Sequence, residues 1–224
     1  MKDYASTDGE LTNHHFDALI QCTAAFARSS GGRTSERAVN LLRRFGNHLV
    51  RSKSELLHWS SALSDLILEK NLETRMLSSQ VLFDLLQNRK NWNQDMTRVA
   101  IVDSIFPSIR RGLEMKSDWF HTNGLSALNK ITFLFEEKKL STLVPDFVDL
   151  LLSHAKKKCT DALFFEILVD VLKRLLARDD ENVDCAAWFR ERMTRLLRLH
   201  NVKVTNFVCD FIDGSLDVVM KRRK

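Results

Sequence analysis

The stretch Ile105-Phe106-Pro107-Ser108-Ile109, followed by Leu113, sets the pattern of this chain. It recurs roughly 40 residues later as Leu143-Val144-Pro145-Asp146-Phe147, followed by Leu151. The chain contains 2 prolines, and they hold the same place in the two stretches. A period of this length with helical spacing inside it is typical of an array of helical repeats.

The repetition continues beyond the prolines. Four apolar residues at helical spacing return after roughly 40 residues: Leu125, Leu128, Ile131 and Phe135 correspond to Phe165, Leu168, Val171 and Leu175. The second copy is two residues longer than the first, and the additional residues fall around Lys156 to Thr160. We therefore expect one helical hairpin in each copy, with Leu128 and Leu168 at equivalent contacts between repeats.

Composition restricts the fold class and the location. The chain has 224 residues, of which 44% are hydrophobic, and only 7 glycines, so it can bury a core and should be nearly all helix. No apolar run approaches the roughly 18 residues of a membrane span, and Met1–Glu10 carries no apolar signal-peptide core. These features predict an intracellular protein without a membrane segment.

Ten helices are expected from apolar residues spaced three and four apart. The first four carry these apolar residues: Phe16, Leu19, Ile20, Ala24 and Ala27; Ala38, Leu41, Leu42, Phe45 and Leu49; Leu56, Trp59, Leu63, Leu66 and Ile67; Leu72, Met76, Phe83 and Leu86. The expected N-caps of the second to fifth helices are Thr34 or Ser35, Ser54, Asn71, and Asn91 or Asn93.

The remaining helices follow the same spacing. Pro107 should kink or restart the fifth helix, because its ring removes an amide and clashes with the preceding turn. The sixth expected helix begins near Asp118. The seventh covers about Leu140–His154 and the eighth about Asp161–Arg178. The ninth ends near Leu199, and the tenth begins near Asn201.

The repeating unit resembles those of the HEAT and armadillo repeat families in three respects. It consists of two helices of this total length, its first helix contains a proline, and one second helix begins with Asn71-Leu72-Glu73-Thr74-Arg75. The resemblance implies an all-α, right-handed α-solenoid of about five hairpins over residues 11–220. Residues 1–10 would be a disordered segment and residues 221–224 a basic tail. In armadillo proteins an asparagine on the groove-lining helix binds the backbone of an extended peptide, and Asn129 lies nearest to that position.

The sequence carries no recognisable catalytic or metal-binding pattern. It contains no glycine-rich phosphate loop, no nucleophile elbow and no H-E-x-x-H motif. His14 and His15 are adjacent, whereas metal-binding pairs on a helix stand three or four residues apart. The four cysteines are far apart in the chain and are expected to be reduced thiols. We therefore expect no enzyme activity, no cofactor, no metal and no small-molecule substrate.

Two helices carry arginines opposite their apolar residues. On the second helix these include Arg37, Arg44 and Arg51, and on the ninth they include Arg192 and Arg195. Each face is either a solvated surface or a surface for an anionic partner.

Two aromatic residues stand among polar ones. Trp188 falls within the arginines of the ninth helix, and Phe133 falls on the polar face of the sixth helix beside Asn129. An exposed aromatic beside arginine is typical of interface hot spots, although each ring could instead pack against a neighbouring repeat.

The combined pattern favours a non-catalytic scaffold or adaptor. It would bind an extended or helical segment of another protein that carries acidic and apolar residues. The alternative is a module that binds RNA or DNA through its basic helix faces, because a basic stripe can track phosphates. The net charge of +5 permits an anionic partner but is lower than in most dedicated nucleic-acid binders. Lys221 to Lys224 resemble a minimal nuclear import signal, so a nuclear or cytoplasmic location is expected.

Overall fold

The computed structural model describes residues 13–29, 31–89, 92–115, 125–137, 140–155, 164, 168 and 185–221. Within these ranges every regular element is a helix and none is a strand, which confirms the predicted all-α class. The chain divides into two compact units, Met1–Ser108 (unit 1) and Ile109–Lys224 (unit 2). The single repeat domain over residues 11–220 stays a prediction. The predicted disordered segment, 1–10, lies outside the described residues, as does most of the tail at 221–224.

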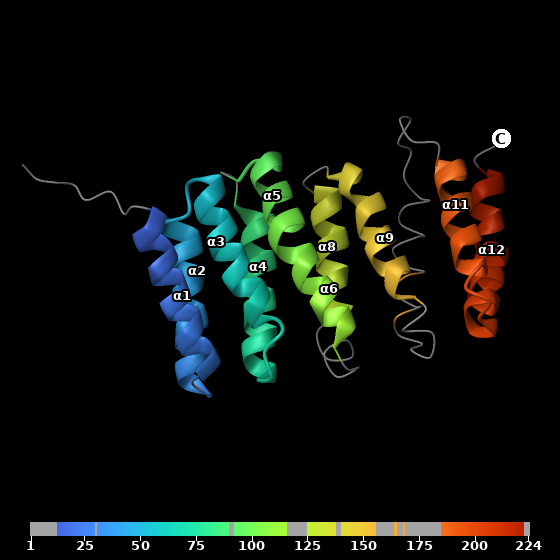
Figure 1. Cartoon of the computed structure of the whole chain (residues 1–224). Coiled ribbons are helices and arrows are strands. Elements are labelled where there is room, and N and C mark those ends of the chain that lie inside the picture. Colours follow the sequence, from blue (N-terminus) through green and yellow to red (C-terminus); the bar gives the residue numbers. More distant parts are fainter. Residues whose placement is uncertain are drawn as a thin grey trace, which may run out of the picture. The chain divides into compact units, whose positions relative to one another are not determined.

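Unit 1 is built from successive helices that pack in pairs (Figure 1). In chain order these are α1 (Asn13–Ser29), α2 (Arg33–His48), α3 (Lys53–Leu66), α4 (Leu72–Asn88), α5 (Gln94–Ala100), the π-helix η1 (Ile101–Ile105) and the beginning of α6 (Phe106–Glu114). α1 packs against α2 and α3, and α2 packs against α4 as well. α3 also contacts α4, α5 and η1, so it lies at the centre of the unit.

Two predicted N-caps are confirmed and a third is corrected. The side chains of Asn71 and Asn93 accept hydrogen bonds from the third residue beyond each of them, which satisfies amides that a helix start leaves unpaired. The cap of α3 is Ser52 and not Ser54. Glu55 explains the difference, because it completes a capping box in which its carboxylate accepts from the Ser52 amide at 2.8 Å.

The start of α2 also differs from the prediction. Gly32 holds the N-cap position with φ of 60°, a left-handed conformation that glycine adopts without steric cost, and no side chain caps the helix. Thr34 and Ser35 therefore do not cap α2. The hydroxyl of Ser35 is buried and donates to the carbonyl oxygen of Ala27 at 2.9 Å, which joins α2 to the end of α1.

Trp59 anchors the core of unit 1, as its place among apolar residues predicted. Its indole N–H donates to the carbonyl oxygen of Leu42 at 2.7 Å, and its ring meets Trp92 edge-on at 5.3 Å between centroids. Gly46 lies so close that a Cβ there would stand 2.7 Å from atoms of Trp59 and Leu85. A glycine in mid-helix is thus explained by the close approach of the tryptophan.

Polar contacts in unit 1 join residues about forty positions apart, the period of a helical repeat. The hydroxyls of Ser35 on α2 and Thr74 on α4 are 2.6 Å apart and separated by 39 positions, and those of Ser60 and Ser104 by 44. Ion pairs follow the same rule: Asp17 with His58, Arg28 with Asp65 and Glu69, Arg43 with Asp84, and Lys53 with Asp95. Alternate helices therefore run alongside each other in register.

The helix around Pro107 contains a π-turn. η1 covers the five residues that precede α6, and the amide of Phe106 donates to the carbonyl oxygen of Ile101. A π-turn is one of the ways in which a helix accommodates a proline, which has no amide to donate. Pro107 is the second residue of α6, and Pro145 is the second residue of its helix in unit 2.

Unit 2 contains α8 (Leu125–Glu137), the 3₁₀-helix η3 (Ser141–Leu143), α9 (Val144–His154), α11 (Cys185–Leu197) and α12 (Val202–Lys221) (Figure 1). Phe135 and Phe147 meet edge-on at 5.6 Å between centroids. The predicted helix start near Asp118 lies outside the described residues, and so does the helix over Asp161–Arg178 apart from the buried Phe164 and Leu168.

Between α11 and α12 the chain reverses through His200, whose φ is 49°. Asn201 then accepts hydrogen bonds from the amides of Lys203 and Val204, as the predicted start at Asn201 requires. Among the described residues, no helix combines the length and the apolar character that crossing a membrane demands.

Candidate interaction surface

The buried side of α2 differs from the predicted one, and the difference creates an exposed apolar residue. The core side consists of Ser35, Ala38, Val39, Leu42 and Gly46. Leu41, predicted to be buried, is 40% exposed, and Phe45 and Leu49 are half-buried. Trp59 packs against Gly46, which brings Val39 and Gly46 into the interior and turns Leu41 toward solvent.

The predicted arginine face of α2 is exposed. Arg37, Arg44 and Arg51 are all exposed, and so is Arg33 at the start of the helix. Arg43 differs from them, because it forms an ion pair with Asp84 of α4 at 3.6 Å. Among the described residues, the guanidinium groups of Arg33, Arg37 and Arg44 have no ion-pair partner. Leu41 lies one turn from both Arg37 and Arg44, so the face combines charge with apolar area.

A hollow of about 290 Å³ lies between the first turns of α2 and α4. Its lining residues are Gly32, Ser35, Glu36, Glu73, Thr74 and Leu77. The hydroxyl groups of Ser35 and Thr74, both in the lining, form a hydrogen bond with each other, and their oxygens are 2.6 Å apart. Glu36 and Glu73 bring two carboxylates to its edge, so the basic face of α2 is bordered by an acidic one.

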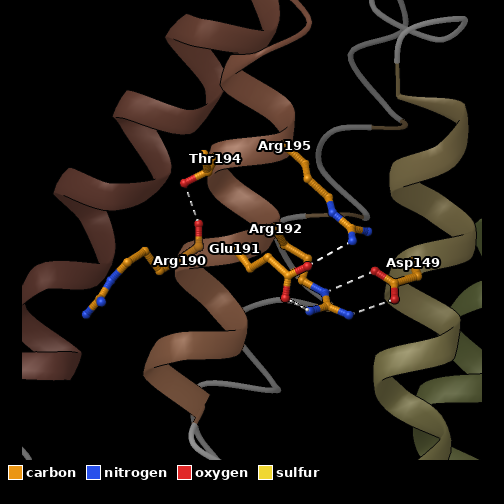
Figure 2. A network of polar contacts seen from close by, with 6 residues as sticks. All are labelled: Asp149, Arg190, Glu191, Arg192, Thr194 and Arg195. Atoms are coloured by element: carbon orange, nitrogen blue, oxygen red, sulfur yellow. Dashed lines mark hydrogen bonds and ion pairs between the residues drawn. The ribbon is translucent and has the colours of Figure 1, made fainter.

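Two arginines of α11, Arg192 and Arg195, are engaged with acidic residues of unit 2 (Figure 2). Arg192 donates to both carboxylate oxygens of Asp149 on α9, at 3.0 and 2.8 Å, and its side chain is only 12% exposed. The hydrogen bond with Asp149 raises the pKa of Arg192 above its ordinary value. Glu191 accepts from Arg192 at 2.9 Å and from Arg195 at 2.8 Å.

This network changes the interpretation of two predicted partner-binding residues. The charge of Arg192 is balanced within the chain, and the residue holds α11 against α9. Arg195 is exposed, but a partner would have to compete with Glu191 for it. Figure 2 shows Arg190 pointing away from this network.

The other predicted site residues divide between exposed and undescribed ones. Phe133 on α8 is 46% exposed, as its place on a polar face predicted. Trp188 lies in α11 and Asn129 in α8, but their side chains lie outside the described residues. Their roles in partner binding stay predictions.

Three features of this surface were not predicted from the sequence: the hollow, its carboxylates Glu36 and Glu73, and the exposure of Leu41. The available signal was Gly46, because a glycine inside a helix often marks the close approach of another element. Centring the buried arc on Gly46 would have turned Leu41 outward.

Among the described residues, no group of three or more His, Cys, Asp or Glu side chains is arranged to hold a metal ion.

No protein-family model matches this chain, and no curated protein or solved structure matches it either.

Proposed function

We propose that the chain is a non-catalytic interaction module that binds a segment of another protein on the exposed face of α2. The observation that carries this proposal is the unbalanced basic face formed by Arg33, Arg37 and Arg44, with Leu41 exposed among them. The bound segment would present acidic and apolar residues. Arg51, which is also exposed, follows the end of α2 in the connection to α3.

The charge of this face favours an anionic partner. Like charges four residues apart on a helix, such as Arg33 and Arg37, destabilise it by a few tenths of a kcal/mol. Carboxylates of a bound segment would remove this repulsion and form charge-assisted hydrogen bonds with the guanidinium groups. Complementary charge also speeds association and selects among partners.

The surroundings of the arginines favour protein over nucleic acid. Glu36 on α2 and Glu73 on α4 place carboxylates beside the arginines, so the surface has mixed charge, whereas a surface that tracks a phosphate backbone is continuously basic. Leu41 offers apolar area at the centre of the face, which phosphates cannot use. A peptide with mixed acidic and apolar side chains can satisfy both features.

The contacts of unit 1 support a rigid platform for such binding. Alternate helices are joined at intervals of about forty residues, as stacked two-helix repeats would be. This regular stacking supports the interpretation as a short α-solenoid. Solenoids use the exposed faces of successive helices as extended binding surfaces.

The test uses the triple variant Arg37→Ala, Arg44→Ala and Arg51→Ala. The matched control removes three exposed cations from unit 2: Arg190→Ala, Arg198→Ala and Lys203→Ala. Proteins co-purified from cells with the intact chain are quantified against both variants, and the affinity of each recovered partner is then measured with the purified chain. We expect the α2 variant alone to lose its partner by about tenfold or more in affinity.

A second arm of the experiment addresses the nucleic-acid interpretation. Binding of a single-stranded RNA 20-mer and a duplex DNA 20-mer is measured at low and high salt. If the chain binds both regardless of sequence, with a steep salt dependence that the α2 variant flattens, the protein-segment proposal is wrong. Equal loss of the partner in both triple variants would also overturn it.

A further inference from the structure

We propose that an amphipathic, acidic helix of the partner protein packs into the seam between α1 and α2, on the side that faces away from α3 and α4. The proposal rests on the proposed function and adds the form of the bound segment. It also adds a second surface to the arginine face, formed by apolar residues of both helices.

The ion pairs of α1 define which of its sides is covered. Asp17 binds His58 at 3.0 Å, and Arg28 binds Glu69 at 3.2 Å, so both residues point toward α3 and the segment that follows it. At 100° per residue, Phe26 lies about 180° from Asp17 and Leu19 about 160° from it. Both therefore lie on the side of α1 that is turned away from α3.

The same reasoning applies to α2. Arg43 binds Asp84 and so marks the side that faces α4. Leu41 and Phe45 each stand two residues from Arg43, which places them about 160° away from it. The bond from Ser35 to the carbonyl of Ala27 aligns the end of α1 with the start of α2, so the two uncovered sides adjoin.

These residues form an apolar strip along the seam. Phe26 is 62% exposed and Leu41 is 40% exposed, while Leu19 and Phe45 are half-buried beside them. On the opposite side of the same two helices, α3 packs against both α1 and α2. The α1–α2 hairpin therefore already packs one helix, α3, along one of its two seams. A second helix can pack along the other seam in the same way, because helix surfaces pack by placing ridges into grooves.

Charge identifies the kind of helix. Arg37 and Arg44 lie one turn before and one turn after Leu41, on the edge of the strip that belongs to α2. A second copy of this chain would bring the same arginines against each other, and that repulsion opposes self-association. A partner helix with apolar residues at i, i+3, i+4 and i+7 and with flanking glutamates or aspartates matches both features.

A displayed library of 20-residue peptides provides the ligands for the test. The intact chain is used to select from this library, and the enriched peptides are synthesised and their affinities measured. The variants are Phe26→Asp and Leu41→Asp, and the matched control is Met76→Asp, because Met76 is also an exposed apolar residue of unit 1, at 57%. Melting curves and a second variant, Phe26→Ala, separate lost binding from lost folding.

We expect enriched peptides with acidic residues and helical apolar spacing that gain circular-dichroism helicity on binding. Phe26→Asp and Leu41→Asp should each weaken them by about tenfold or more, and Met76→Asp should not. If the Phe26 and Leu41 variants bind them as well as the intact chain while the arginine variant does not, the seam proposal is wrong and the proposed function stands. Enriched peptides that are basic or extended would overturn the seam proposal, and so would sedimentation showing a dimer that Phe26→Asp dissociates.

Discussion

Two hydrogen bonds join Arg192 on α11 to Asp149 on α9, and they run in parallel from the guanidinium to both carboxylate oxygens at 3.0 and 2.8 Å. Paired bonds of this kind fix the relative position of two side chains as well as attracting them. Because the Arg192 side chain is only 12% exposed, removing Asp149 leaves the cation with little access to water and with Glu191 as its remaining acidic contact among the described residues. The pair is therefore expected to stabilise unit 2.

Asp149→Ala should lower the free energy of unfolding by about 1–3 kcal/mol, because a charged group would lose its hydrogen-bond partner in a part-buried place. Glu191→Ala is the control, since Glu191 is exposed and such ion pairs contribute about 0–1 kcal/mol. Urea unfolding of both variants gives the comparison. Equal small losses in the two variants would show that the pair contributes no more than a surface contact does.

The sequence predicted most elements of unit 1 because their apolar spacing and caps are local signals. Trp59, Leu63 and Leu66 are buried as expected, and Asn71 caps α4 as expected. The exposed side of α2 was predicted wrongly for Leu41, since spacing alone allows two apolar arcs and only the contact of Gly46 with Trp59 decides between them.

The candidate site was harder to predict than the fold. The basic face of α2 follows from its own sequence, and exposure of Arg37, Arg44 and Arg51 agrees with it. Engagement of Arg192 depends on Asp149, which lies 43 positions earlier, and nothing local to α11 reveals it. The hollow at Glu36 and Glu73 likewise depends on the register of α2 against α4.

Gly46→Ala should destabilise unit 1 even though alanine favours a helix by about 1 kcal/mol over glycine. The added Cβ would stand 2.7 Å from atoms of Trp59 and Leu85, and crowding of a packed core costs about 1–3 kcal/mol. Gly31→Ala serves as the control, because a Cβ there meets nothing within 4 Å. Thermal melts report both changes, and a higher melting temperature for Gly46→Ala would contradict the described packing.

Glu55→Gln should change how stability depends on pH. Burial raises the pKa of Glu55, but hydrogen bonds from the amides of Arg51 and Ser52 outweigh it and lower the pKa below 4.5. A lowered folded-state pKa gives stability that is present above the unfolded value and disappears as the pH falls through the folded value. The intact chain should therefore exceed Glu55→Gln in stability at pH 7, and the difference should vanish in acid.

Unfolding of both proteins from pH 7 to pH 2.5 tests this dependence. Ser52→Ala removes the other half of the capping box and should cost about 1 kcal/mol at pH 7. A constant difference between the intact chain and Glu55→Gln across the range would mean that the Glu55 charge contributes nothing.

Leu168→Ala and Leu128→Ala should destabilise the chain by similar amounts, about 2–5 kcal/mol each. The two leucines hold equivalent places in the sequence repeat, and both are completely buried. Loss of a buried leucine removes apolar area from the interior and leaves a cavity that the neighbours fill only in part. Leu197→Ala is the control, because Leu197 is 39% exposed and its truncation should cost much less. Chemical unfolding monitored by circular dichroism gives the three values. A melt of Leu168→Ala that matches the intact chain would show that the two stretches are not structural repeats, whatever their resemblance in sequence.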